Sequence, residues 1–243
     1  MSNVLSLPQL NFLFSYNLPE RQVLLVAGGR PPASSWLAAA AGSFTVWGVD
    51  SGVDSLKNSD VQPVAVIGDG DSATPAAWEW AKSLGIPVEI HPPEKDLTDL
   101  QLALQRTGEL YEQAAVIVTG VWGGRFDHTF SNIYSLLGSK TFGLAPCCAA
   151  DDKEILVLLH GPDRVNIQLK HQPSAVSLLP LSDCSGVTIT GVRWPLNKVT
   201  LSTGLPYAIS NRPTTDKTRL SVSLDHGCLG IYLCWDDNEL SNL

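Results

Sequence analysis

Short, continuously apolar runs that alternate with helix-like segments are the feature of this 243-residue chain that most restricts its fold. Residues 23–27, 64–67 and 115–119 are such runs. A strand that is covered on both faces is apolar throughout, whereas a strand with one solvated face alternates. We expect two further strands at residues 45–49 and 87–90. We expect the intervening helices at residues 34–41, 74–84, 97–111 and 129–137. This alternation predicts an α/β domain with a parallel sheet covered by helices on both faces.

The pattern changes near residues 145–153. Beyond them, short segments rich in Val, Ile, Leu, Thr and Ser are separated by Gly, Pro, Asp and Asn, without a long helical period. Such segments are typical of a small antiparallel β-sandwich or barrel. We therefore predict an α/β plus all-β chain, with an irregular extension at residues 1–21, an α/β domain at 22–148 and a β-sandwich at 149–243.

Charge and composition exclude several classes of partner. The net charge is −8 and there is no run of basic residues, so nucleic acid and anionic membrane are not expected partners.

The five cysteines are odd in number and form no C-x-x-C pair, which favours reduced thiols. The longest uncharged stretch, residues 31–49, begins with Pro-Pro and is not a membrane span, and the start of the sequence is a poor signal peptide. We expect a cytoplasmic protein.

The first of three aspartate clusters, residues 68–72 (GDGDS), follows the apolar run 64–67. Residues two apart in an extended segment point to the same side, so Asp69 and Asp71 can share a cation, with Ser72 beside them. Ligands of open α/β sheets bind at the carboxyl ends of strands, where this cluster is expected. An ordinary acidic turn is the alternative interpretation.

The second cluster, residues 96–99 (DLTD), precedes a strongly predicted helix. Either Asp96 or Thr98 is suited to cap this helix, and Asp99 then lies in its first turn. An aspartate beyond what capping requires is a candidate metal ligand. Lys95 either contacts phosphate or is simply solvated.

The third cluster, residues 123–128 (GGRFDH), follows the run 115–119 and is the most specific. The glycine pair, including Gly124, leaves main-chain N–H groups accessible to an anion. Arg125 has a fork of donors that matches phosphate oxygens. Asp127 is suited to orient Arg125, to accept a hydrogen bond from a substrate hydroxyl, or to cap the next helix. Carboxylates from separate loops together with an arginine indicate Mg²⁺ holding a polyphosphate.

In this order and spacing, the three clusters resemble the G-D-x-D-S, D-x-T-D and G-G-R-x-D-H elements of thiamin pyrophosphokinases. A D-G-G element of that family aligns with residues 50–52 (DSG), where serine replaces the middle glycine and leaves the role of Asp50 less defined. The resemblance continues in the second half, where residues 190–196 (TGVRWPL) are similar to a T-G-x-x-[WY]-x-L stretch and residues 210–211 to an S-N pair.

The resemblance implies transfer of a pyrophosphoryl group from ATP to the hydroxyl of thiamine, which yields AMP and thiamine diphosphate. It also implies a homodimer with thiamine near the subunit interface. Carried over by position, Asp69, Asp71 and Asp99 would handle Mg²⁺ and polyphosphate, Arg125 would hold phosphate, and Asp127 would lie by the reacting hydroxyl. The other implied ATP or thiamine contacts are Asp50, Ser72, Lys95, Asp96, Thr98, Gly124, Trp194, Ser210 and Asn211. Trp194 would stack on the thiazolium cation.

Two other functions fit parts of the sequence. A phosphohydrolase of the haloacid-dehalogenase type also places D-x-D after an apolar strand and uses Mg²⁺, but it would leave the arginine cluster without a role. A non-catalytic thiamine- or nucleotide-binding protein would have kept the pocket without turnover. The intact carboxylate clusters argue against that second alternative.

Overall fold

The computed structural model describes residues 2–92, 94–205, 207–214 and 218–236. The chain divides into two compact units. Unit 1 combines Met1–Leu18 with Asp152–Leu243, and unit 2 is the continuous stretch Pro19–Asp151.

Unit 2 contains a parallel sheet, as the apolar runs predict. Its strands, in spatial order, are β8 (Ala145–Ala150), β7 (Ala115–Thr119), β3 (Gln22–Val26), β4 (Thr45–Val49), β5 (Ala65–Gly68) and β6 (Val88–Ile90). Each of these neighbouring pairs is parallel. Every residue of β7 is buried, and so is every residue of β3 except Gln22, which explains why these strands are continuously apolar.

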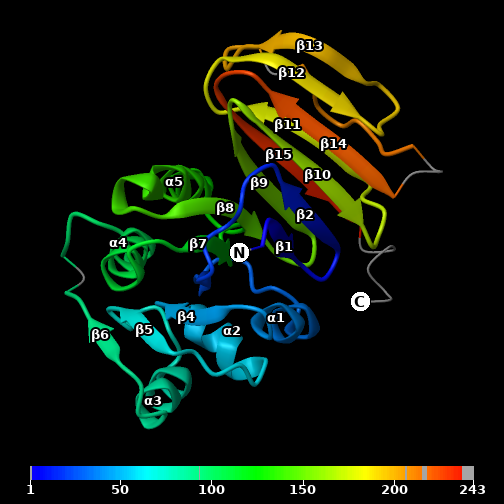
Figure 1. Cartoon of the computed structure of the whole chain (residues 1–243). Helices are drawn as coiled ribbons and strands as arrows, with labels where there is room; N and C mark the ends of the chain where they lie inside the picture. The colour runs from blue at the N-terminus through cyan, green and yellow to red at the C-terminus, as the bar shows by residue number, and fades with distance from the viewer. Residues whose placement is uncertain (1, 93, 206, 215–217, 237–243) are drawn as a thin grey trace. The chain divides into compact units, whose positions relative to one another are not determined.

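The helices of unit 2 are α1 (Ser34–Ala41), α2 (Gly52–Asn58), α3 (Pro75–Ser83), α4 (Asp99–Tyr111) and α5 (Phe126–Gly138), followed by the 3₁₀ turn η1 (Ser139–Phe142). Helices α1 to α3 lie on one side of the sheet and α4 and α5 on the other (Figure 1). Thr74 caps α3 by accepting a hydrogen bond from the Ala77 amide, at the start of the helix expected at residues 74–84. In the part of the chain that the structure describes, no helix is both long enough and apolar enough to cross a membrane.

Two helices differ from the sequence prediction. The sequence did not predict α2, because only Val53 and Leu56 supply large apolar side chains to its buried face. Helix α5 was expected at residues 129–137 but begins at Phe126. Asp127 therefore lies in the first turn of α5, where a carboxylate is favoured by the helix dipole.

The strand order of unit 2 has a reversal point beside β3. From β3 the chain proceeds to β4, β5 and β6 in one direction, and then continues on the other side of β3 with β7 and β8. The turns that follow β3 and β7 lead away from this point in opposite directions. In open parallel sheets this arrangement leaves a crevice at the carboxyl ends of the strands, where ligands bind.

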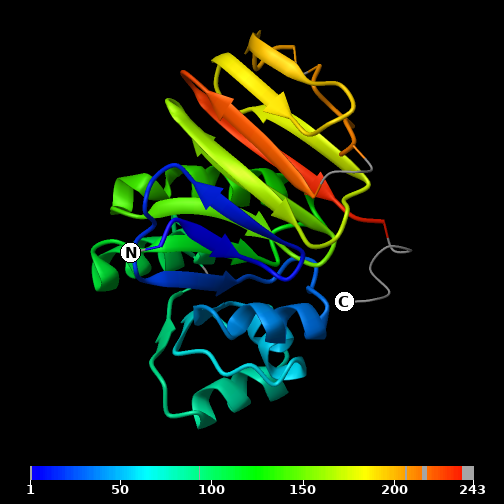
Figure 2. The same cartoon turned by 45° about the vertical axis from the view of Figure 1, so that its right-hand side comes forward.

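Unit 1 consists of antiparallel strands (Figure 2). One six-stranded sheet has the order β1 (Val4–Ser6), β2 (Leu10–Phe14), β10 (Asp163–Leu169), β14 (Arg219–Leu224), β12 (Cys184–Thr190) and β13 (Leu196–Leu201). A second group has the order β11 (Ala175–Pro180), β15 (Cys228–Cys234) and β9 (Glu154–His160). Burial alternates along β10, as expected for a strand with one face on the core.

The expectation of an irregular extension at residues 1–21 was wrong for its first part. Strand β2 pairs with β10, from Leu10 opposite Leu169 to Phe14 opposite Val165. Leu10, Phe12 and Phe14 are buried while the residues between them are not, a period-two pattern that the sequence contained. These N-terminal strands are therefore part of the antiparallel sheet of unit 1.

Candidate functional site

A cavity of about 1090 Å³ lies in unit 2 at the carboxyl ends of the parallel strands. All eleven candidate residues from the first half of the chain line it, although they come from four separate segments: Asp50, Asp69, Asp71, Ser72, Lys95, Asp96, Thr98, Asp99, Gly124, Arg125 and Asp127. The three sequence clusters therefore meet at one place.

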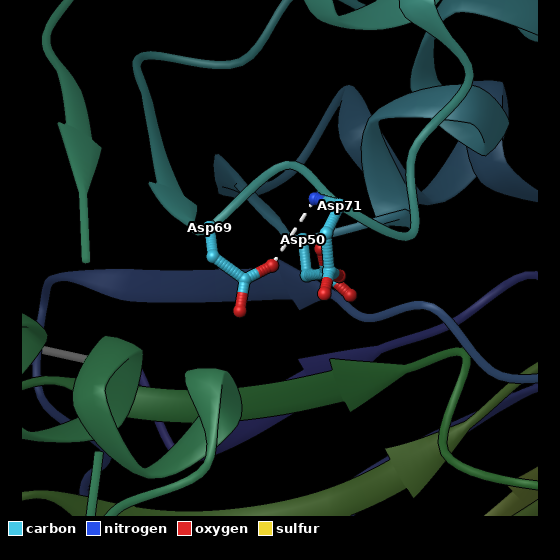
Figure 3. A group of neighbouring side chains, drawn as sticks. All are labelled: Asp50, Asp69 and Asp71. Carbon is cyan, nitrogen blue, oxygen red and sulfur yellow. Dashed lines mark hydrogen bonds between the residues drawn. The ribbon is translucent and has the colours of Figure 1, made fainter. Parts of the chain in front are cut away.

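At the ends of β4 and β5 and the start of α4, the cavity is lined by a group that we call the acidic wall: Asp50, Asp69, Asp71, Lys95 and Asp99. Asp50 follows β4, Asp69 and Asp71 follow β5, and Asp99 begins α4. Asp50, Asp69 and Asp71 each place one carboxylate oxygen within 4.8 Å of the other two (Figure 3). The Asp71 amide donates to Asp69 Oδ1 (3.2 Å), so the loop itself holds these two carboxylates side by side.

Asp50 is the most unusual carboxylate of the acidic wall. Its Oδ1 atom is buried and has no hydrogen-bond partner among the described residues. Burial raises the pKa of Asp50, and the nearby carboxylates of Asp99, Asp69 and Asp71 add to this effect, although the Ser51 amide opposes it. Its backbone has a φ of 48°, and Gly68 packs against it so closely that a Cβ at Gly68 would lie 2.9 Å from Asp50 Cα. The strained backbone and the buried oxygen both indicate a position kept for a ligand.

Lys95 places an internal positive charge in the acidic wall. Its Nζ lies 2.9 Å from Asp69 Oδ2 and 3.2 Å from Asp99 Oδ1, and the side chain is only 14% exposed. Burial acts to lower the pKa of Lys95, but the hydrogen bonds to Asp69 and Asp99 outweigh it and raise the pKa overall. The bond from Lys95 is also the main reason that the pKa of Asp69 is lowered. Lys95 is therefore bound to carboxylates rather than simply solvated.

The hydrogen bonds at the start of α4 show which residue of the second cluster caps the helix. Thr98 is the cap: its side chain accepts from the Gln101 amide (3.3 Å), and Gln101 Oε1 accepts from the Thr98 amide (2.9 Å). Asp96 is therefore not needed for capping, and it lines the cavity. Asp99 occupies the first turn.

Beyond the ends of the neighbouring strands β3 and β7, the cavity is lined by a group that we call the arginine wall: Arg30, Arg125 and Asp127. Arg125 Nε donates to Asp127 Oδ1 (3.1 Å) and Nη2 donates to Oδ2 (2.5 Å). These hydrogen bonds are the main cause of the lowered pKa of Asp127 and the raised pKa of Arg125. Of the three roles open to Asp127, the structure therefore shows the first, orientation of Arg125.

Sequence reasoning missed Arg30. It follows β3 and lines the cavity, and its guanidinium forms an ion pair with the fully buried Asp151 (2.6 Å). The signal was present in the Gly28-Gly29 pair directly after the apolar run 23–27, the same arrangement of glycines and arginine that singled out Arg125.

The remaining candidates, Trp194, Ser210 and Asn211, lie in unit 1. The Trp194 amide donates to Asn211 Oδ1 (3.1 Å), and Asn211 Nδ2 donates to the Trp194 carbonyl (2.7 Å). Trp194 is 54% exposed, and the guanidinium of Arg193 lies 4.8 Å from the centre of its ring. The structure thus joins Trp194 and Asn211 by two hydrogen bonds, and Ser210 precedes Asn211 in the chain.

Comparisons with known proteins agree with this arrangement. The family model "Thiamin pyrophosphokinase, catalytic domain" matches residues 39–145, and "Thiamin pyrophosphokinase, vitamin B1 binding domain" matches residues 164–229. The thiamine pyrophosphokinase of Bacillus subtilis (strain 168) is 30% identical over 194 residues, which span 79% of this chain and 89% of that protein. Thiamine pyrophosphokinase 1 of Oryza sativa subsp. japonica is 27% identical over 68% of this chain and 64% of its own length.

Solved structures show the same fold. The crystal structure of the Bacillus subtilis thiamine pyrophosphokinase has a TM-score of 0.74 and 26% identity, and the match covers 89% of this chain and all of that chain. A thiamin pyrophosphokinase family protein from Enterococcus faecalis has a TM-score of 0.75 at 23% identity, with the same coverage. From its sequence, its two family domains and its fold, this chain belongs to the thiamin pyrophosphokinase family.

Proposed function

We propose that this chain transfers the pyrophosphoryl group of ATP to the hydroxyl of thiamine, with the polyphosphate of ATP bound in the cavity of unit 2. The hydroxyl oxygen forms a bond to the β-phosphorus, the bond from that phosphorus to the α-phosphate oxygen breaks, and AMP leaves while the hydroxyl proton is released. The observation that carries the proposal is the convergence of carboxylates and arginines from separate loops on one cavity at the carboxyl ends of parallel strands. Phosphoryl transfer depends mainly on this kind of positioning and charge stabilisation.

The donor set of the acidic wall fits Mg²⁺, which prefers oxygen ligands from a few carboxylates. The sequence assigns Asp69, Asp71 and Asp99 to the metal. The geometry supports Asp50 as a further ligand, because its buried Oδ1 has no protein partner in the described part of the chain and lies with Asp69 and Asp71. When bound, Mg²⁺ would neutralise charge on the phosphate oxygens.

The arginine wall would bind and orient the reacting groups. Arg125 would bind phosphate through its planar fork. Asp127 stays ionised because Arg125 lowers its pKa, so it would accept a hydrogen bond from the thiamine hydroxyl and orient its oxygen. The remaining nucleotide contacts we propose are Ser72, Lys95, Asp96, Thr98 and the main-chain N–H of Gly124.

Thiamine would be held by Trp194, Ser210 and Asn211 of unit 1. Two observations support stacking of Trp194 on thiamine: its ring is exposed, and the cationic guanidinium of Arg193 already lies over it. The thiazolium of thiamine is also a cation and would bind an aromatic face in the same way. We extend the proposal to a catalytic role for unit 2, residues 19–151, and a thiamine-binding role for unit 1, which includes residues 1–18 besides 152–243 and so replaces the expected bounds of 22–148 and 149–243. We also propose a cytoplasmic homodimer with thiamine near the subunit interface.

The test is a reaction of the purified chain with ATP, Mg²⁺ and thiamine, followed by chromatography. We expect AMP and thiamine diphosphate in equal amounts, and neither product when thiamine or Mg²⁺ is omitted. Formation of ADP and thiamine monophosphate would contradict the proposed bond cleavage. Release of inorganic phosphate with a covalent phosphate on Asp69 would instead support a phosphohydrolase.

A further inference from the structure

Arg30 lines the cavity, although it lies outside the part of the chain that matches the family's catalytic domain. That match covers residues 39–145, whereas Arg30 precedes it and its partner Asp151 follows it. Both residues belong to unit 2. The family match therefore assigns no role to this ion pair.

Asp151 fixes the guanidinium of Arg30. Nη2 and Nε of Arg30 both donate to Asp151 Oδ2, at 2.6 and 3.2 Å. The Asp151 side chain is fully buried, whereas the Arg30 side chain is 32% exposed. A buried carboxylate holds its counter-charge strongly, because losing that charge leaves it uncompensated. The ion pair thus holds one edge of the guanidinium in the protein, while part of the side chain remains accessible at the cavity.

The backbone around Arg30 is fixed as well. The hydrogen-bond ladder between β3 and β7 continues past both strands, from the Gly29 amide to the Gly120 carbonyl (2.7 Å) and from the Arg30 amide to the Trp122 carbonyl (2.5 Å). The two turns approach so closely that a Cβ at Gly29 would meet the Gly120 carbonyl oxygen. The Arg30 guanidinium also lies 5.9 Å from the centre of the Trp122 ring. Asp151, the backbone hydrogen bonds and the Trp122 ring therefore all fix Arg30 before any ligand binds.

This position is the reversal point of the sheet, between the ends of β3 and β7. Anions bind readily at such crevices, and the Gly123–Arg125 turn borders the same cavity. We propose that Arg30 is a second polyphosphate-binding arginine, oriented in advance by Asp151. This inference rests on the proposed function, because it assumes that a polyphosphate occupies the cavity.

The competing explanation is that Arg30 only neutralises Asp151, and a pair of variants separates the two. Arg30→Met leaves a buried charge and should lower the Tm, whereas Arg30→Met with Asp151→Asn removes both charges and should recover much of the Tm. Calorimetric titration with inorganic tripolyphosphate and with adenosine 5′-(α,β-methylene)triphosphate, each with Mg²⁺, measures the contact itself. Adenosine without phosphates is the ligand control.

We expect both variants to bind tripolyphosphate and the ATP analogue roughly 10- to 100-fold more weakly than the wild type, the loss typical of one charge-assisted hydrogen-bonding group. Adenosine binding should be unchanged. Arg106→Met is the matched control, because Arg106 also forms ion pairs in unit 2 but does not line the cavity, and it should bind as the wild type does.

The inference is overturned if the double variant regains wild-type affinity together with its Tm. If Arg30→Met does not fold, Arg30→Lys keeps the charge without the planar fork and should still weaken tripolyphosphate binding; unchanged binding would count against the inference. If the wild type itself binds neither polyphosphate, the proposed function fails, and that outcome is distinct from loss of the Arg30 contact alone.

Discussion

The two sides of the cavity differ in how their charges are balanced. The acidic wall gathers four carboxylates around one lysine, and one buried oxygen, Oδ1 of Asp50, has no partner among the described residues. On the arginine wall, Arg30 forms an ion pair with Asp151 and Arg125 forms one with Asp127. An excess of carboxylates favours binding of an added cation, whereas an ion pair keeps its geometry without one. We therefore expect a bound cation to stabilise the acidic wall, whereas ion pairs of the protein itself already fix the arginines of the arginine wall.

Removing one acid from the acidic wall should have the largest effect. We expect Asp71→Asn to lower turnover roughly 100- to 1,000-fold, because a charged group that acts on the transferred phosphates is lost. Steady-state formation of AMP measures this, and the Tm should not fall, since Asp71 is exposed. Asp99→Asn tests the second assignment in the same assay.

Asp60→Asn is the matched control, because Asp60 is an exposed aspartate of unit 2 that does not line the cavity. It should keep wild-type turnover. Near-normal turnover of Asp71→Asn would show that this carboxylate does not act on the phosphates or their metal.

The variant Arg125→Met tests whether the exposed ion pair of Arg125 with Asp127 contributes to ligand binding rather than to folding stability. Its side chain is 74% exposed, so Arg125→Met should leave the Tm unchanged. We expect the KM for ATP to rise roughly 10- to 100-fold through loss of a charge-assisted contact. A lowered Tm with an unchanged KM would reverse this interpretation.

A variant in unit 1 should leave both walls intact. Trp194→Ala should weaken thiamine binding roughly 3- to 30-fold, the range of a cation–π contact, without changing affinity for the ATP analogue. Fluorescence or calorimetric titration of each ligand measures the two affinities. Equal losses for both ligands would indicate that Trp194 is structural.

The smallest expected effect is a rise in Tm when the charge of Asp50 in the acidic wall is removed. The pKa of Asp50 is raised, chiefly by burial, so ionisation of Asp50 costs folding stability. That cost is absent below the unfolded pKa and grows as the pH rises through the folded pKa. Asp50→Asn has no such charge and tolerates the positive φ, so in EDTA at pH 7 its Tm should exceed the wild-type Tm by roughly 2–4 °C.

At pH 3 the difference should disappear, because Asp50 of the wild type is then protonated. Added Mg²⁺ should raise the Tm of the wild type more than that of Asp50→Asn. A lower Tm for the variant at pH 7 would show that the Asp50 carboxylate stabilises the fold.

The sequence predicted the sheet of unit 2 well, because strands buried on both faces leave an unmistakable apolar run, as in β3 and β7. Thr98 could be recognised as a cap candidate because capping is a local interaction. Helix α2 was not predicted, since its seven residues show little periodicity and its stability comes from packing against β3 and β4. Strand β2 was missed because its pairing partner lies far along the chain.

The sequence indicated those candidate site residues that lie next to one another in the chain. Each of the three clusters is local in the sequence, so their carboxylates and Arg125 could be named as candidates, and all of them line the cavity. The ion pair of Arg30 with Asp151 joins residues 121 positions apart, and no local pattern links them. The bond of Lys95 to both Asp69 and Asp99 is likewise a product of folding, because the loop and the helix start must first meet.

The pairing of β2 with β10 has a consequence for how the chain is made. Leu10 leaves the ribosome long before its partner Leu169, and at about 5–20 residues per second the delay is roughly 8–30 s. Unit 2 is synthesised in that interval, whereas β2 can pair only with β1 until β10 is available. Phe12 and Phe14, buried in the finished protein, are then exposed hydrophobic residues on a nascent chain, which is where a chaperone would bind first.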